Sequence, residues 1–180
     1  MASFKIPITT MLKSLLFLSL FSLSHLVSGD DKLVEIVCHE TDEPEICVQC
    51  LRSAHGADTS SKLGIATAVI TCLEEHGTSL GAEMTSIASG AKEDYGKRLF
   101  EGCSKDYSDS NKDLVSAVGL LKGRKYDGAE KAVTGAFYRH ESCRNDIGAY
   151  KNVTVPSKVA YEMKIYEDLC QVADRIIERL

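Results

Sequence analysis

Two cysteines lie at equal distances on either side of one glycine, which limits how this chain can fold. Cys103 precedes Gly123 by 20 residues and Cys143 follows it by 20. If the chain runs along one helix to Gly123 and back along another, a rise of about 1.5 Å per residue brings both cysteines to the same height. Antiparallel helices pack about 8–10 Å apart, close enough for facing cysteines to bond. The spacing predicts two long antiparallel helices bridged by Cys103–Cys143.

A second pair of cysteines, closer together in the sequence, has the same arrangement near the N-terminus. Cys38 and Cys47 each lie about four residues from the turn signal at Asp42 and Glu43. Pro44 follows this signal, at a position that suits the first turn of a helix. The pattern predicts a helical hairpin over residues 31–54, closed by a Cys38–Cys47 disulfide.

Seven cysteines cannot all pair, and Cys50, Cys72 and Cys170 are left over from these two pairs. Cys47 and Cys50 have the CxxC spacing of redox and zinc sites, and Cys72 lies one helical turn before His76, where Cys170 could complete a metal site. A free cysteine is more often a small buried apolar residue. We therefore predict two disulfides, three thiols, and no metal or other cofactor.

The first 29 residues have the features of a secretory signal. Lys5 and Lys13 precede an apolar run at 15–23 (LLFLSLFSL), which is too short to cross a bilayer as a helix. Small residues at 27–29 favour cleavage before Asp30. A membrane anchor is the alternative, and the short run disfavours it. We predict an extracellular protein.

Cleavage would leave one domain of 180 − 29 = 151 residues, spanning 30–180. The signal contains two lysines and no acid, so the net charge falls from −5 to 19 − 26 = −7. This acidic balance argues against nucleic acid and anionic membranes as partners, and it allows a basic protein partner.

Four long helices are indicated between the hairpin and the C-terminus. No proline occurs between Pro44 and Pro156, and apolar residues recur at alternating steps of four and three. This 3.5-residue period is that of helical bundles. The second seam has polar gaps between Cys103 and Leu114. The four seams are Ala66, Ile70, Leu73, Gly77, Leu80, Met84 and Ile87; Leu99, Cys103, Leu114, Val118 and Leu121; Tyr126, Ala129, Val133, Ala136, Phe137, Cys143 and Ile147; and Val159, Tyr166, Leu169, Ala173, Ile176 and Leu180.

Turn signals divide these helices. They fall at 57–61, 89–90, 122–124 and 148–157, and such short connections imply antiparallel neighbours. The predicted fold is all-α: an up-and-down four-helix bundle over 58–180, preceded by the helical hairpin. The last connection contains Asn152-Val153-Thr154, a sequon at which we predict a glycan on Asn152.

Catalytic motifs are absent from the sequence. There is no nucleophile elbow, zinc-protease motif or phosphate-binding loop. The histidines at 39, 55, 76 and 140 are scattered, and no pair has metal-ligand spacing with a third ligand. Acid pairs for glycoside hydrolysis depend on distances in space, which sequence spacing does not give. We predict that the chain is not an enzyme.

Several motifs occur in an order that resembles a known family, the plant invertase and pectin methylesterase inhibitors. The resemblance covers residues 33–180. The motifs are Cys38 to Cys47 followed by Val48-Gln49-Cys50-Leu51; Cys103-Ser104-Lys105-Asp106-Tyr107-Ser108-Asp109 with Leu114; Lys125-Tyr126; Gly135-Ala136-Phe137 through Cys143; and Tyr166-Glu167-Asp168-Leu169-Cys170. The last run is similar to one found in some pectin methylesterase inhibitors.

The resemblance implies both a fold and a function. Family members form a hairpin and a four-helix bundle, with bridges from first to second and from third to fourth cysteine. They block pectin methylesterase or acid invertase in the cell wall or vacuole. In the esterase inhibitors, the second to fourth bundle helices face the enzyme's active-site cleft. We expect a monomer that forms a 1:1 complex with pectin methylesterase in the apoplast, with invertase as the alternative target.

The sequence departs from the family where partner contacts are expected. Lys105 and Lys112 replace common acids, Ser110 replaces an alanine, and only Asp109 keeps the acidic pattern. The family's Thr-Cys-x-Asp run is here Ser142-Cys143-Arg144-Asn145. Residues 105, 109 and 112 share one helix face, and Cys103–Cys143 would bring the neighbouring helix to the same height. The candidate partner-binding residues are Lys105, Tyr107, Asp109, Lys112, Ser142 and Asn145; the alternative is an ordinary solvated face.

A carrier of a lipid or small ligand is the alternative from another functional class. Small seam residues could leave a cavity in the bundle, although they more often let helices pack closely. An apolar pocket of several hundred Å³ in the core would favour a carrier, and a filled core would favour an inhibitor. The small residues are Ala66, Gly77, Ala129, Ala136 and Ala173.

Overall fold

The structure, a computed structural model, describes residues 29–54, 56–150 and 154–180, and all regular structure in these ranges is helical. Most of the predicted signal and the predicted glycan site Asn152 lie outside the described residues. The helices are α2 (Gly29–His39), α3 (Pro44–Ser53), α4 (Lys62–Gly90), α5 (Asp94–Lys122), α6 (Tyr126–Ala149) and α7 (Ser157–Ile177).

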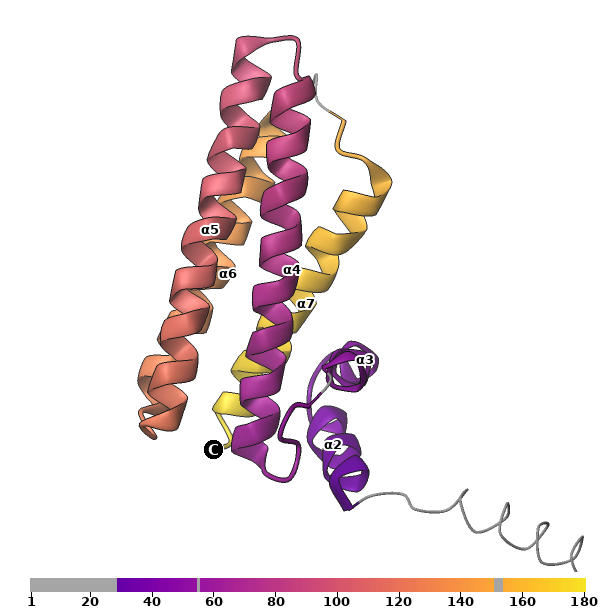
Figure 1. The fold of residues 1–180 in the computed structure, drawn as a ribbon, viewed down its shortest axis with the longest axis vertical. Coiled ribbons are helices and arrows are strands. Elements are labelled where there is room, and N and C mark those ends of the chain that lie inside the picture. Colours follow the sequence, from indigo (N-terminus) through magenta and orange to yellow (C-terminus); the bar gives the residue numbers. More distant parts are fainter. Residues whose placement is uncertain (1–28, 55, 151–153) are drawn as a thin grey trace, which may run out of the picture.

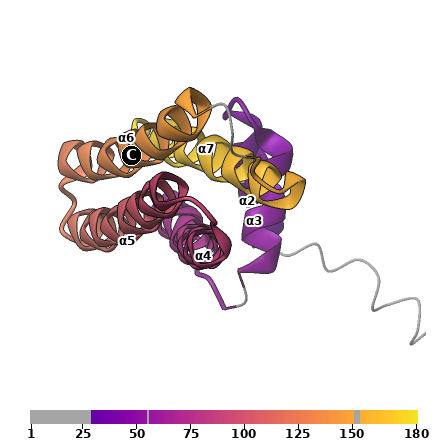
Figure 2. The ribbon, with the colours of Figure 1, turned by 90° about the horizontal axis from the view of Figure 1, so that it is seen from above.

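The last four helices form an up-and-down antiparallel bundle, so the predicted all-α fold is confirmed (Figure 1). Within it α4 packs most extensively on α5, and α5 on α6, whereas α6 and α7 touch less. The short helices α2 and α3 lie outside the bundle, against α4 and α7 (Figure 2). Arg179 joins the C-terminus to this hairpin, because its guanidinium donates to the Glu40 carbonyl oxygen at 2.6 Å.

Local chemistry accounts for where the helices begin and end. The Ser61 hydroxyl accepts a hydrogen bond from the Gly64 amide at 3.1 Å and caps the start of α4. Pro44 occupies the first turn of α3, where its missing N–H costs nothing. At the α5–α6 turn the left-handed residue is Arg124, with φ of 54°, rather than Gly123.

The core lies along the predicted seams. In α4 every seam residue is buried except Ile87, which is half-buried against the core. The polar residues that interrupt the predicted seams are also buried in the core. Tyr107 and Ser110 in α5, and His140 in α6, are buried at 1%, 0% and 1% exposure. Their positions continue the alternating steps of four and three, so the bundle core is partly polar.

Three disulfides are present rather than the two predicted. The structure joins Cys38 to Cys47 and Cys103 to Cys143, with Cα atoms 5.5 and 4.9 Å apart. It also joins Cys50 to Cys72, with Cα atoms 6.1 Å apart.

The prediction of three thiols was therefore wrong. Cys50 and Cys72 lie on the consecutive helices α3 and α4, but Cys50 is 54 − 50 = 4 residues before the connection at 54–61 and Cys72 is 72 − 61 = 11 residues after it, so a search for cysteines at equal distances from a turn misses the pair. The CxxC hypothesis also fails, because Cys47 and Cys50 belong to different disulfides. The hypothesis of a metal held by Cys72, His76 and Cys170 fails because Cys72 is oxidised. The Cys50–Cys72 disulfide ties the hairpin to the bundle and spans 22 residues of sequence. In the chain-entropy model, closing a loop of this length stabilises the folded protein by about 3 kcal/mol.

A thiol count will test this pairing. All seven cysteines lie among the described residues, and of these Cys170 alone is free; it is fully buried on α7, and burial raises the pKa of its thiol. We expect the folded protein to show no reactive thiol and the protein unfolded without reductant to show one. A Cys170→Ala variant should show none in either state. Three thiols in the unfolded wild type would contradict the Cys50–Cys72 disulfide.

Candidate functional site

An exposed charged cluster lies on α5 at the predicted partner-binding positions. Lys105 and Lys112 each donate from Nζ to Asp109 at 2.7 Å, one to each carboxylate oxygen. The two lysine side chains are 76% and 73% exposed, and Asp109 is 18% exposed. The two ammonium groups hold the pKa of the Asp109 carboxyl well below its usual range. The two lysines of the same helix therefore balance the negative charge of Asp109, and their side chains extend into solvent.

Arg139 on α6 extends this cluster across the helix pair. Its Nη1 lies 3.8 Å from Asp109 Oδ2, and its Nε donates to Asp113 at 2.8 Å. The cluster of Lys105, Lys112 and Arg139 with Asp109 and Asp113 has a formal charge of 3 − 2 = +1. Asp106 also lies close enough to interact with Arg139 and Lys105, and with this carboxylate the formal charges of the surface balance.

Ser142 and Asn145 are exposed on α6, on either side of Cys143 in the sequence. The Cys103–Cys143 disulfide fixes the height of this segment against α5, and Lys105 is two residues beyond Cys103. Lys112 lies nine residues beyond Cys103, or about 14 Å along the helix. We call Lys105, Asp109, Lys112, Ser142 and Asn145 the α5–α6 patch.

Tyr107 does not belong to this patch, and its prediction as a partner-binding residue was wrong. Its side chain is 1% exposed, and its hydroxyl lies 2.9 Å from His140 Nδ1 inside the bundle. The reason is its spacing: Tyr107 follows Cys103 by four residues and precedes Leu114 by seven, which places it on the inward seam. A partner could not reach it without opening the helices.

Tyr107 is part of a buried polar cluster that connects α5, α6 and α7. Ser110 donates to the Ala136 carbonyl oxygen at 2.9 Å and accepts from the Tyr166 hydroxyl at 3.1 Å. The His140 ring stacks on Tyr166 with centroids 5.3 Å apart, and Tyr107 meets Tyr166 edge-on at 5.5 Å. Burial lowers the pKa of His140 to about 4 and raises that of both tyrosines. All three side chains are therefore neutral near neutral pH.

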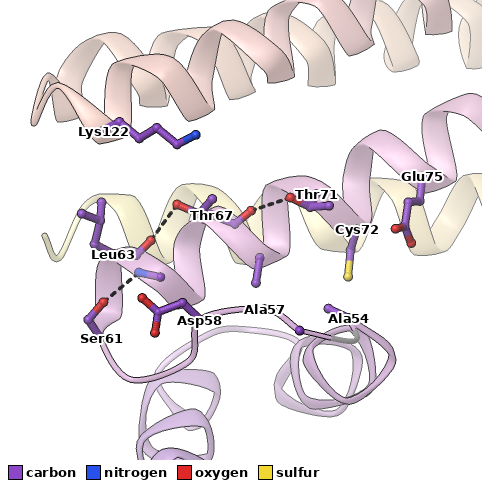
Figure 3. A pocket seen from close by; sticks show the side chains of 13 residues that line it. Ala54, Ala57, Asp58, Ser61, Leu63, Thr67, Thr71, Cys72, Glu75 and Lys122 are labelled. Atoms are coloured by element: carbon purple, nitrogen blue, oxygen red, sulfur yellow. Dashed lines mark hydrogen bonds between the residues drawn. The ribbon is translucent and has the colours of Figure 1, made fainter.

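A surface hollow of about 430 Å³ lies between the α3–α4 connection and the first turns of α4 (Figure 3). Its wall includes Ala54, Ala57, Thr67 and Thr71, and the two threonine hydroxyls donate to carbonyl oxygens of their own helix. The lining also includes the charged side chains of Glu75 and Lys122, and the hollow lies outside the bundle core. It does not match the apolar core cavity on which the carrier alternative depends.

Comparison with known proteins decides the family. The model of the plant invertase/pectin methylesterase inhibitor family matches residues 32–176. The chain belongs to this family. It is an enzyme inhibitor by family and not an enzyme, as its sequence predicts. No helix in the described part is long and apolar enough to cross a bilayer.

Individual relatives agree with this assignment. The pectinesterase inhibitor of Actinidia deliciosa is 23% identical over 163 residues, which are 91% of this chain and 87% of that protein. The crystal structure of mutant form A of a pectin methylesterase inhibitor from Arabidopsis has a TM-score of 0.68 at 22% identity, covering 80% of this chain and 94% of that one. A second inhibitor structure from Arabidopsis thaliana has a TM-score of 0.61 at 20% identity, covering 82% and 95%.

Ser110, which replaces the alanine that the resemblance leads us to expect, gives a test of the buried cluster. We expect Ser110→Ala to lower the free energy of unfolding by about 1–2 kcal/mol, because the Tyr166 hydroxyl loses its acceptor. In a Tyr166→Phe background the same change should cost about 1 kcal/mol less. Denaturant unfolding of all four proteins measures both effects.

Ser108→Ala is the matched control, since Ser108 is exposed on the same helix. It should change stability by less than about 0.5 kcal/mol. If Ser110→Ala cost the same in both backgrounds, the two hydroxyl groups would not interact.

Proposed function

We propose that this family member is a secreted inhibitor of pectin methylesterase that covers the enzyme's active-site cleft. The observation that carries the proposal is the similarity to a pectinesterase inhibitor over 91% of the chain, within the family match. Acid invertase is the other target class in the family's name, so the experiment must include both enzymes.

The physical mechanism is occlusion by a rigid surface. The Cys103–Cys143 disulfide ties α5 to α6, and the buried cluster links α5 to α6 and α7, so little conformational entropy remains to be lost on binding. The exposed faces of α5 and α6 supply charged and polar side chains. The polysaccharide is excluded because the protein occupies its groove.

The direct experiment titrates the mature chain, residues 30–180, against pectin methylesterase and against acid invertase at mildly acidic pH. We expect the esterase to lose activity with an endpoint at one inhibitor per enzyme, and the invertase to keep its activity. Reduced and alkylated protein is the control, because it loses the rigid surface but keeps the composition. Inhibition of invertase alone, or of neither enzyme, would contradict the proposal.

The α5–α6 patch makes a second prediction. The resemblance places acids at positions 105 and 112 in esterase inhibitors, so their target surface should be basic there, and the two lysines should repel it. Lys105→Glu with Lys112→Asp should therefore tighten binding to the esterase about tenfold, or about 1.4 kcal/mol. The change also places two acids beside Asp109, so we expect the free energy of unfolding to fall by about 1 kcal/mol with the fold retained.

Lys62→Glu with Lys92→Asp is the matched control, because it makes the same change in net charge at the start of α4 and in the α4–α5 connection. It should leave the dissociation constant unchanged. If neither double variant alters binding, the interface lies elsewhere on the bundle. If the patch variant weakens binding, the enzyme surface facing the lysines is acidic.

A further inference from the structure

A histidine nitrogen is buried in the bundle without a partner. His140 is 1% exposed, and its Nδ1 lies 2.9 Å from the Tyr107 hydroxyl. Its other ring nitrogen, Nε2, is buried and has no hydrogen bond within the described residues. Native proteins rarely leave such an atom unpaired, so it indicates an absent ligand or water.

Two carboxylates come close to the same nitrogen. Glu141 Oε1 is also buried without a hydrogen bond, and it lies 4.0 Å from His140 Nε2, beyond hydrogen-bonding distance. Glu167 approaches from α7. One ligand atom from each of His140, Glu141 and Glu167 lies within 4.8 Å of the others.

We propose that His140, Glu141 and Glu167 bind a divalent transition metal, with Zn²⁺ as the best match. Zinc takes histidine nitrogen and carboxylate oxygen at about 2.0–2.2 Å, so tetrahedral ligand atoms are about 3.4 Å apart. The 4.0 Å separation of His140 and Glu141 would close by about 0.6 Å. Ca²⁺ and Mg²⁺ fit less well, because they prefer all-oxygen sites. Three protein ligands leave one position for water.

The surroundings of His140 suit a metal ligand. If Nδ1–H donates to the Tyr107 oxygen, the lone pair on Nε2 is free for the metal, and Tyr107 acts as a positioning residue. Arg144 Nη2 donates to Glu141 Oε2 at 2.5 Å and leaves Oε1 available. With Glu141, Glu167 and Arg144 the site has a formal charge of −1, which a divalent cation would change to +1.

A surface groove reaches one of the three proposed ligands, Glu167, whereas His140 and Glu141 are not among its lining residues. Arg144, Lys164 and Glu167 line a groove of about 600 Å³ between the end of α6 and the start of α7. Lys164 is paired with Asp168 in the same helix, so it does not neutralise Glu167 in advance. An ion could therefore reach Glu167 from solvent without opening the bundle.

The test is zinc binding by the disulfide-intact mature chain, measured by calorimetry near neutral pH with ZnCl₂ alone. We expect one zinc per chain, and we expect Glu167→Gln and Glu141→Gln each to weaken binding at least tenfold. Glu162→Gln is the matched control, because Glu162 lies on the same helix and faces His76 Nδ1 at 3.6 Å in a surface pair. It should leave zinc affinity unchanged.

Imidazole proton–nitrogen spectra locate the metal and separate ligation from a structural effect. Zinc should shift the Nε2 signal of His140, and Tyr107→Phe should weaken binding about 10- to 100-fold at unchanged stoichiometry. The proposal is overturned if zinc does not bind, if Glu162→Gln abolishes binding while Glu167→Gln does not, or if only other histidines shift. In those cases the two unpaired atoms share a water. The readout involves no target enzyme, so it is independent of the proposed inhibition.

Discussion

The Cys103–Cys143 disulfide fixes the register of α5 against α6, and the arrangement of both faces of this helix pair depends on it. Seven residues from each bridged cysteine, Ser110 donates to the carbonyl oxygen of Ala136. Between these two contacts lie Tyr107 and His140, which meet at 2.9 Å. A shift of one residue would separate these partners and leave polar groups unpaired in the core. The same register places Ser142 and Lys105 at one height outside.

The helices and their inward faces could be predicted from the sequence, because each rests on information within one segment. Alternating steps of four and three gave the seams, and glycine, proline and polar clusters gave their ends. The Cys50–Cys72 disulfide could not be found in this way. It joins α3 to α4, and the direction in which the hairpin folds against the bundle is set by packing between elements rather than by any local pattern.

The error at Tyr107 shows a different limit. Its spacing from Cys103 and Leu114 places it on the inward seam, whereas the other candidate partner-binding residues lie on the outer faces of α5 and α6. A polar side chain can be buried when a partner satisfies it, and here the partner is His140, 33 residues away on another helix. The proximity of Glu167 to His140 and Glu141 was equally hidden, because it depends on where α7 crosses α6.

The two sides of α5 therefore differ in how freely they can change. Inward positions must preserve both volume and hydrogen bonds, so a change at Ser110 affects Tyr166 as well. Outward positions such as Lys105 and Lys112 pair with Asp109 and are otherwise largely exposed, and ion pairs of this kind contribute little to stability. Charges on this face can be reversed at little cost to the fold. This separation is consistent with the fold that the chain shares with the two Arabidopsis inhibitor structures at 20–22% identity.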